Sequence, residues 1–264
     1  MSGGVRIAAS GARTVDAATQ RPDSWPECTP EHRAGPLRND VTGYYADKLS
    51  GRRLQRCYEI VPPRVQQYLE AEIRHVQDRL ESRDAVLELG CGYGRVSFRL
   101  AEVARRVIGI DVSLESVNLA EQLAGSESRC RFMHMDALEL QFSDGEFDAV
   151  VCVQNGICAF GVDQEALLRE AVRVVGAGGL ALFSSYADRF WHDRLGWFEL
   201  QAADGLIGPI DYAATGAGTI VCADGFRAGR LLPDEFESLC AKLGLECATS
   251  EIDGSSVFCE IRKP

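Results

Sequence analysis

Apolar and polar positions follow an alternating pattern between residues 84 and 185. Short apolar runs alternate with segments whose apolar residues recur at helical spacing. The runs predict buried parallel strands at Ala85–Leu89, Arg106–Asp111, Arg131–Met135, Asp148–Val153 and Leu180–Ser185. Helices are predicted between them near 94–104, 113–124 and 164–175, the last one stopped by Gly176, Gly178 and Gly179. This alternation predicts a doubly wound α/β fold, with helices on both faces of a parallel sheet.

The chain before this alternation divides into two parts. Residues 1–40 are rich in Gly, Ala, Ser, Arg and Pro without a hydrophobic period, and they predict a flexible N-terminal tail. Residues 41–82 predict a helical lid. It would contain a short helix around 43–58 and an amphipathic helix over 63–81 that has Pro63 near its first turn.

The last third of the chain departs from the alternation. A segment of helical period, 188–203, carries the aromatic residues Phe190, Trp191, Trp197 and Phe198. A hairpin, a helix and a second hairpin are predicted after it: Ile220–Arg230 turning at Asp224-Gly225, Pro233–Leu243 ending at Gly244, and Leu245–Ile252 with Ser256–Ile261 around Asp253-Gly254. We therefore expect a core that spans 83–264 and contains an insertion at about 186–232.

Composition narrows the class of protein. The 264 residues, 46% of them hydrophobic, suit one large domain with a sizeable core. The formal net charge of -11 repels phosphate backbones, so we expect no nucleic-acid partner. No apolar stretch approaches the roughly 20 residues that span a bilayer, and Met1–Ser10 lacks the pattern of a signal peptide. We therefore expect a cytoplasmic protein without a membrane partner.

The ten cysteines give no metal-binding pattern. Their spacings contain neither a CxxC pair nor a zinc motif. Cys91, Cys152, Cys222 and Cys259 lie in apolar or glycine-rich runs, and we predict that the cysteines are reduced core residues. We therefore expect no metal site.

The most informative motif is the segment 86–94, which reads VLELGCGYG. A strand leads into a Gly-x-Gly-x-Gly turn, and glycine is needed where backbone approaches a ligand closely or adopts positive φ. The third glycine, Gly94, follows the second by two residues. The dinucleotide-binding fingerprint places it three residues on, where this chain has Arg95. Glu88, near the end of the strand, can reach the ammonium of a bound amino acid, which nicotinamide dinucleotides lack.

Acidic residues also end the next two strands. Asp111 ends the second strand, where its carboxylate can accept hydrogen bonds from both hydroxyls of a ribose. Asp136 ends the third strand, where a carboxylate can accept from the amino group of adenine. Each acid also has a purely structural interpretation: a strand-end carboxylate for Glu88, a helix-start acid for Asp111 and a turn residue for Asp136.

The segment of about 84–185 resembles the core of class I S-adenosylmethionine-dependent methyltransferases, of the small-molecule type. Glu88 and the three glycines match the first motif of that family, Asp111 its ribose acid, and Asp136 its adenine-edge motif. The family's strand order is 3-2-1-4-5-7-6 with the last strand antiparallel, which the second hairpin fits independently. The resemblance implies that S-adenosylmethionine is the cofactor and that it is held by Glu88, Gly90, Gly92, Gly94, Asp111, Val112, Asp136 and Ala137. The further candidate cofactor-binding residues are Tyr44, Cys91, Val153 and Gln154.

The acceptor side of the site is predicted from three segments. Gln154 and Asn155 follow the fourth strand, where the family contacts the methionine end or the acceptor; capping of the next helix is the alternative. Tyr44 and Tyr45 could close over the sulfonium or pack the lid onto the core. His192, in the aromatic insertion, is the best placed general base or else a solvated side chain. The candidate catalytic residues are therefore His192, Asn155 and Tyr45.

We predict transfer of a methyl group from S-adenosylmethionine to a small-molecule acceptor with an N, S or O nucleophile. The alternatives are a C- or metalloid methyltransferase, a catalytically silent cofactor-binding protein, and a dinucleotide oxidoreductase. Arsenic methyltransferases need a cysteine close behind an asparagine in the loop after the fourth strand. Here Gly156 follows Asn155, and the nearest cysteine is Cys158. The loop also lacks the Asn/Asp-Pro-Pro-aromatic pattern of nucleobase-amine methyltransferases. The acceptor and the oligomeric state are not predicted.

Overall fold

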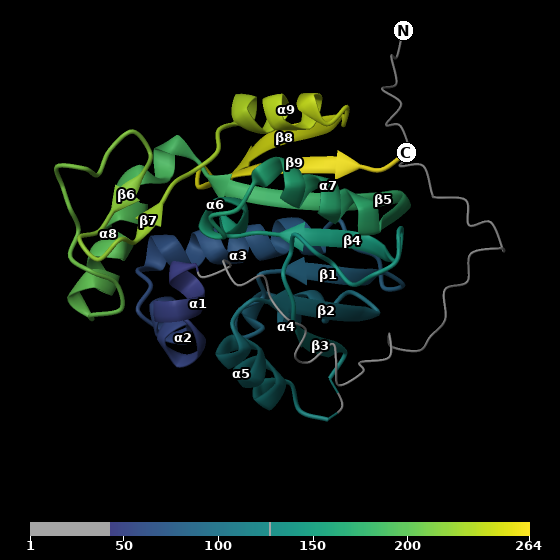
Figure 1. Ribbon diagram of the computed structural model, residues 1–264, viewed down its shortest axis with the longest axis horizontal. Helices are drawn as coiled ribbons and strands as arrows, with labels where there is room; N and C mark the ends of the chain where they lie inside the picture. Colours follow the sequence, from purple (N-terminus) through teal and green to yellow (C-terminus); the bar gives the residue numbers. More distant parts are fainter. Residues whose placement is uncertain (1–42, 127) are drawn as a thin grey trace, which may run out of the picture.

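A seven-stranded mixed sheet forms the centre of the molecule, which a computed structural model describes over residues 43–126 and 128–264 (Figure 1). Its order is β3-β2-β1-β4-β5-β9-β8. The strands are β1 (Ala85–Leu89), β2 (Arg106–Asp111), β3 (Cys130–His134), β4 (Phe147–Cys152), β5 (Val175–Tyr186), β8 (Cys247–Ile252) and β9 (Ser256–Arg262). β1 to β5 pair in parallel, whereas β9 pairs antiparallel with both β5 and β8. The predicted order 3-2-1-4-5-7-6 is confirmed. The predicted tail, 1–40, lies outside the described residues.

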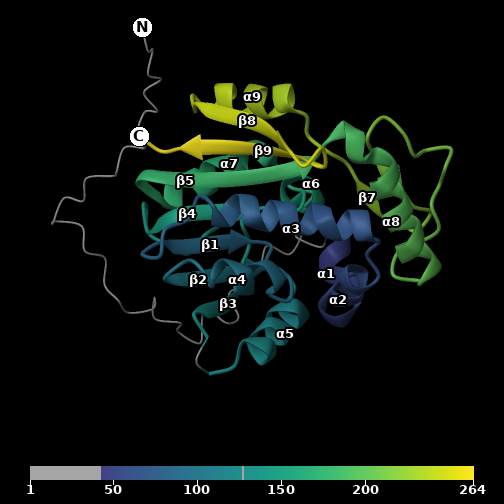
Figure 2. The ribbon, with the colours of Figure 1, turned by 180° about the vertical axis from the view of Figure 1, so that it is seen from behind.

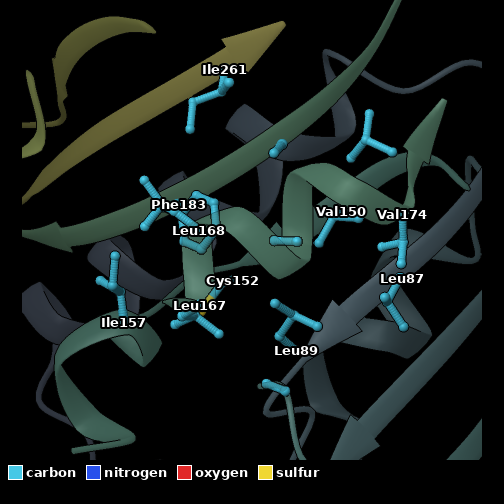
Figure 3. Close-up of a cluster of buried hydrophobic side chains, with 14 of the residues drawn as sticks. Leu87, Leu89, Val150, Cys152, Ile157, Leu167, Leu168, Val174, Phe183 and Ile261 are labelled. Atoms are coloured by element: carbon cyan, nitrogen blue, oxygen red, sulfur yellow. The ribbon is translucent and has the colours of Figure 1, made fainter. Parts of the chain in front are cut away.

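Two layers of helices cover the sheet, because successive side chains of a strand point to opposite faces. Val86 and Val107 pack on one face and Leu87 and Ile108 on the other. The first face is covered by α3 (Pro63–Gln77), α4 (Arg95–Leu100) and α5 (Leu114–Ala124), which lie in front in Figure 2. The second is covered by α6 (Gly156–Ala159), α7 (Gln164–Val174) and α9 (Pro233–Lys242). Figure 3 shows the apolar core between this second layer and the sheet. The doubly wound arrangement is thus as predicted.

The N-terminal helices and the insertion after β5 pack against each other beyond the carboxyl ends of the parallel strands (Figure 1). The elements are α1 (Tyr44–Lys48), α2 (Gly51–Glu59), η1 (Asp188–Phe190), α8 (Trp191–Ala203), β6 (Ile220–Val221) and β7 (Arg227–Ala228). The Trp197 indole Nε1 donates to the Cys57 carbonyl at 3.0 Å. Arg56 Nε donates to Asp204 at 2.9 Å. Aromatic packing and these bonds join α2 to α8, so that lid and insertion form one covering unit.

The predicted boundary between α7 and β5 is wrong. The helix ends at Val174, and Val175 already begins β5, a strand of 12 residues. The glycines predicted to stop the helix therefore lie inside the strand. Val175 pairs with Phe147, but the next pair is Leu180 with Ala149, so the register between β4 and β5 shifts there. The glycine-rich stretch of β5 lies in this irregular part of the strand. Gly179 accepts from the backbone amide of Lys263 at 3.1 Å, so the C-terminus secures this part of β5.

Both predicted hairpins are confirmed. β6 and β7 pair across Asp224-Gly225, with Val221 opposite Arg227. β8 and β9 are joined by a three-residue loop, 253–255, in which Asp253 and Gly254 have positive φ angles of 56° and 64° and the Ser255 amide donates to the Ile252 carbonyl at 3.0 Å. Within 43–126 and 128–264, none of the helices has the length and apolar character needed to cross a membrane.

Candidate cofactor and acceptor site

A cavity lies at the carboxyl ends of β1, β2 and β4, covered by α1, α2 and α8. Tyr45, Leu54 and Trp197 line it from these three helices. The empty space, counted with its open mouth, is about 1390 Å³. The lining comes from the strand ends and from all three covering helices, so the cavity is a concave site of the kind that small ligands occupy. Its position at the strand ends is the usual one for ligands in open α/β sheets.

The glycine turn between β1 and α4 forms one wall of this cavity. Gly90, Gly92 and Gly94 have φ angles of 72°, 54° and 86°, a region that L side chains rarely adopt. A Cβ atom on Gly92 would also come within 2.8 Å of Leu54 Cδ2 on the lid. The backbone amides of Gly90 and Cys91 donate to the Ile110 carbonyl at 2.8 and 2.9 Å, which fixes the turn against β2. Backbone geometry therefore explains why the turn needs glycine.

Glu88 lines the cavity beside this turn with its carboxylate buried. The Ser97 hydroxyl donates to Glu88 Oε2. Burial raises the pKa of the Glu88 carboxyl to about 7, against the lowering effects of the Ser97 hydrogen bond and of the Arg95 charge. A cationic group bound nearby would stabilise the ionised form. The position is therefore suited to an ammonium ligand.

Asp111 ends β2 and lies across the turn from Glu88. Its Oδ2 accepts from the Gly92 amide at 2.9 Å, and its Oδ1 accepts from the Ser113 amide at 2.8 Å. Burial raises the pKa of this carboxyl, and the two backbone hydrogen bonds oppose that effect. Each carboxylate oxygen retains a further lone pair, so Asp111 can accept from two additional donors. A ribose with two free hydroxyls supplies such donors.

Asp136 follows β3 and lines the cavity together with Val112 and Ala137. Asp136 Oδ1 accepts from the Leu138 amide at 2.8 Å. Its Oδ2 is buried and has no hydrogen-bond partner among the described residues. Buried acceptors are nearly always paired in folded proteins, so this oxygen points to a donor on a ligand. An exocyclic amino group, such as that of adenine, fits it.

The loop after β4 has a strained backbone. Gln154 and Asn155 have φ angles of 56° and 64°, which cost energy for residues other than glycine. The Gln154 amide donates to Glu72 Oε2 and to the Ser184 hydroxyl, both at 2.8 Å, and these bonds hold the loop. Val153 and Gln154 line the cavity. Gln154 Nε2 is buried without a partner in the part of the chain that the structure describes.

Asn155 is not among the residues that line the cavity. It is buried, with Nδ2 donating to the Gly229 carbonyl at 3.1 Å and Oδ1 accepting from the Ser185 hydroxyl at 2.8 Å. Asn155 precedes α6, but its side chain makes no capping hydrogen bond. Both amide atoms thus connect the loop after β4 to β5 and the insertion, a role that neither sequence interpretation foresaw.

The two lid tyrosines have different surroundings. Tyr45 lines the cavity, and burial raises the pKa of its hydroxyl well above the ordinary value, so the group stays protonated. Tyr44 does not line the cavity. Its hydroxyl donates to Asp224 in the β6–β7 turn, and Lys48 Nζ donates to the Asp224 carbonyl at 3.0 Å. Tyr44 therefore connects the lid to the insertion through a hydrogen bond.

The aromatic insertion reaches the cavity through the middle of α8. Trp197 and Phe198 line it, whereas Phe190 and Trp191 pack in the cluster between lid and insertion. His192 is exposed and does not line the cavity. Of the three candidate catalytic residues, the structure therefore brings only Tyr45 into the cavity.

Several cavity residues were missed by the sequence analysis: Tyr58, Tyr93, Arg95, Tyr186 and Gln201. The Arg95 guanidinium lies over the Tyr58 ring, 4.3 Å from its centroid, and its Nη2 is buried without a hydrogen-bond partner among the described residues. Arg95 directly follows the third glycine, so its place in the motif was an available signal. No sequence signal marks Tyr58 and Gln201, because these two residues come together only through the packing of α2 against α8.

Comparison with known proteins bears on the family of the chain. Residues 86–179 match the family model described as "Methyltransferase domain". Residues 86–179 therefore form a methyltransferase domain of the S-adenosylmethionine-dependent class. This confirms the family inferred from the glycine turn and the strand-end acids.

Individual relatives resemble parts of the chain. The Bacillus subtilis protein YqeM is 31% identical over 114 residues, 42% of this chain and 46% of its own length. The 2-methyl-6-phytyl-1,4-hydroquinone methyltransferase of Synechocystis is 31% identical over 137 residues, 48% of this chain and 42% of its own. The chain thus spans less than half the length of these relatives. A crystal structure of a Pyrococcus horikoshii protein, PH0226, is 25% identical with a TM-score of 0.58, covering 77% of this chain and 92% of that one.

Proposed function

We propose that the cavity binds S-adenosylmethionine and that the protein transfers its methyl group to a small-molecule acceptor. The observation that carries this proposal is a set of buried polar atoms in the cavity wall that lack partners among the described residues: Asp136 Oδ2, Arg95 Nη2 and Gln154 Nε2. One is an acceptor and two are donors. The adenine amino group and the methionine carboxylate of this cofactor are complementary to them.

Each polar part of the cofactor has a matching side chain. Glu88 would face the ammonium group, Arg95 the carboxylate, Asp111 the ribose hydroxyls and Asp136 the adenine amino group. Charge-assisted hydrogen bonds of this kind are roughly twice as strong as neutral ones. When bound, the cofactor supplies an activated methyl group on a positively charged sulfur. The chain's own contribution is to hold that sulfur and the acceptor in line and to exclude water.

The acceptor would lie between the cofactor and the covering unit of lid and insertion. Tyr45, Tyr186, Trp197 and Phe198 provide aromatic walls there, and aromatic faces attract a sulfonium. Burial raises the pKa of the Tyr45 and Tyr186 hydroxyls, so they donate hydrogen bonds and do not take protons near neutral pH. We therefore favour a compact, largely apolar acceptor whose nucleophile needs no strong base, such as an amine, a thiolate or a phenolate.

The alternative acceptors have less support. Among the described cysteines, Cys57 and Cys91 line the cavity, but burial raises the pKa of both thiols, which disfavours thiolate binding of a metalloid. Cys158 does not line the cavity. The formal net charge of -11 disfavours a nucleic-acid acceptor.

Calorimetry and a methyl-transfer assay test this function. We expect the full chain to bind S-adenosylhomocysteine and not NAD, since the cavity offers Glu88 and Arg95 to an amino acid. A screen of amines, thiols and phenols with radiolabelled cofactor should then detect labelled product. Binding of NAD in place of S-adenosylhomocysteine would refute cofactor and activity together. Binding without transfer to any acceptor would favour a catalytically silent cofactor-binding protein.

A further inference from the structure

Three cysteine side chains from separate elements converge at the C-terminal edge of the sheet. Cys240 comes from α9, Cys247 from β8 and Cys259 from β9. Their Sγ atoms all lie within 4.8 Å of one another, and those of Cys240 and Cys259 are 3.8 Å apart. Within the described residues, no other group of three or more His, Cys, Asp or Glu side chains is arranged to hold a metal ion.

The topology of the last hairpin brings these thiols together. Cys259 pairs with Thr249 and Cys247 with Ile261, so the two cysteines are diagonal neighbours on one face of the β8–β9 pair. Cys240 and Cys259 are buried in the core between sheet and helices, whereas Cys247 is half-buried. A small ion could therefore reach the cluster past Cys247.

We propose that Cys240, Cys247 and Cys259 form a three-thiolate site for a soft divalent metal ion of the Zn²⁺ type. Tetrahedral zinc with Zn–S bonds of about 2.3 Å holds its sulfur ligands about 3.8 Å apart. The Cys240–Cys259 separation already has this value, and the other pairs need to close by about 1 Å at most. Thiolate ligands select soft or borderline ions over Mg²⁺ and Ca²⁺. The fourth position is left for water on the Cys247 side.

Each thiol must lose its proton to bind a metal ion, so metal binding must release protons and tighten as the pH rises. Glu237 lies one turn before Cys240 and accepts from the Thr249 hydroxyl at 2.9 Å.

The site would fasten α9 to both strands of the hairpin. β9 pairs with β5 from Leu180 to Tyr186, so the hairpin is continuous with the rest of the sheet. None of the three cysteines lines the cavity, which separates this site from the proposed methyl transfer. A metal bound here would stabilise the folded chain by mass action without taking part in chemistry.

The test is a titration of the reduced full chain with Cd²⁺, with oxygen excluded, followed by thiolate-to-metal charge-transfer absorbance in the ultraviolet. We expect one equivalent to bind, competition by Zn²⁺, and a rise in the melting temperature. Cys247→Ser removes a half-buried ligand with little risk to folding and should weaken binding roughly tenfold or more. Cys158→Ser, which changes a half-buried thiol outside the cluster, should leave the titration unchanged.

Two results would overturn the proposal. The first is an absent charge-transfer band, or one that Cys247→Ser and Cys240→Ser leave intact. The second is loss of two thiols to a disulfide in air together with no metal binding by the reduced chain, which would make the cluster a redox pair. Cofactor binding is measured separately with S-adenosylhomocysteine, so failure here leaves the proposed function untouched.

Discussion

Glu72 and Gln154 are 82 residues apart in the sequence, yet Glu72 Oε2 accepts the backbone amide of Gln154 at 2.8 Å. Glu72 lies on α3 and is fully buried, and Gln154 is one of two adjacent non-glycine residues with positive φ. Ser184 Oγ accepts from the same amide, also at 2.8 Å. A carboxylate on an N-terminal helix thus holds the strained loop that forms one wall of the cavity.

The charge of Glu72 should make folding stability depend on pH. Burial raises the pKa of this carboxyl from 4.5 to about 7. Because the folded pKa exceeds the unfolded one, the folded state binds the proton more tightly, and this contribution is lost as the pH rises through that window. Glu88 acts in the same direction, since burial raises its pKa to about 7. We expect the free energy of unfolding in urea to fall between about pH 5 and about pH 7.

Glu72→Gln gives the control for this effect, because an amide keeps an acceptor for Gln154 without titrating. Its free energy of unfolding should decline less steeply over the same pH range. Glu81→Gln, an exposed carboxyl on the loop before β1, should retain the full slope. Equal slopes for the wild type and Glu72→Gln would show that Glu72 does not titrate in this range.

Cofactor affinity should rise with pH through about 7, where Glu88 ionises. The ammonium of S-adenosylhomocysteine needs a carboxylate, and below that pH binding must first remove a proton from Glu88. Isothermal calorimetry at several pH values measures this dependence. Glu88→Gln should bind more weakly and lose most of the pH dependence. A dependence that survives in Glu88→Gln would assign the titration to another group.

Asp111→Ala should weaken S-adenosylhomocysteine binding roughly tenfold or more, since a hydrogen bond to a charged group contributes about 1.5–3 kcal/mol. The same carboxylate accepts from the Gly92 and Ser113 amides, so circular dichroism must show that the variant is folded. Asp144→Ala changes an aspartate that is 79% exposed and serves as the matched control. An unchanged dissociation constant in a folded Asp111→Ala protein would remove this residue from the cofactor site.

The sequence was informative wherever a local pattern determines structure. The period of apolar residues places β1 and β2 at the bounds observed, and the Asp253-Gly254 pair correctly indicates the last hairpin. Glu88 and Asp111 could be found because parallel strands deliver their carboxyl ends to one edge of the sheet. These inferences need no knowledge of which segments distant in the sequence pack together.

Long-range packing explains what the sequence could not predict. His192 and Trp191 share a helix with Trp197, but the rotation of α8 against α2 brings Trp197 to the cavity and leaves His192 in solvent. Asn155 has its amide engaged by Gly229 and Ser185, partners that no local pattern indicates. The cysteine cluster was missed for the same reason, because its spacings match no short motif.

A substitution in the wall that the covering insertion contributes to the cavity should lower acceptor turnover and leave cofactor affinity nearly unchanged. Phe198 lines the cavity from α8, next to Trp197, and its side chain has no group that could hydrogen-bond a cofactor. Phe198→Ala should therefore depress turnover roughly tenfold to a hundredfold by misplacing the acceptor, while leaving S-adenosylhomocysteine affinity nearly unchanged. His192→Ala should change neither quantity, because the side chain is exposed outside the cavity.

Removal of a buried aromatic side chain also costs about 3–5 kcal/mol of stability, so Phe198→Leu is needed beside the alanine variant. Leucine retains most of the apolar volume and should keep the melting temperature closer to that of the wild type. If turnover falls in Phe198→Leu while the protein stays folded, the loss reports on the acceptor wall and not on global stability. A fall in turnover with His192→Ala alone would instead restore the histidine as a general base, and it would require α8 to rotate toward the cavity when the acceptor binds.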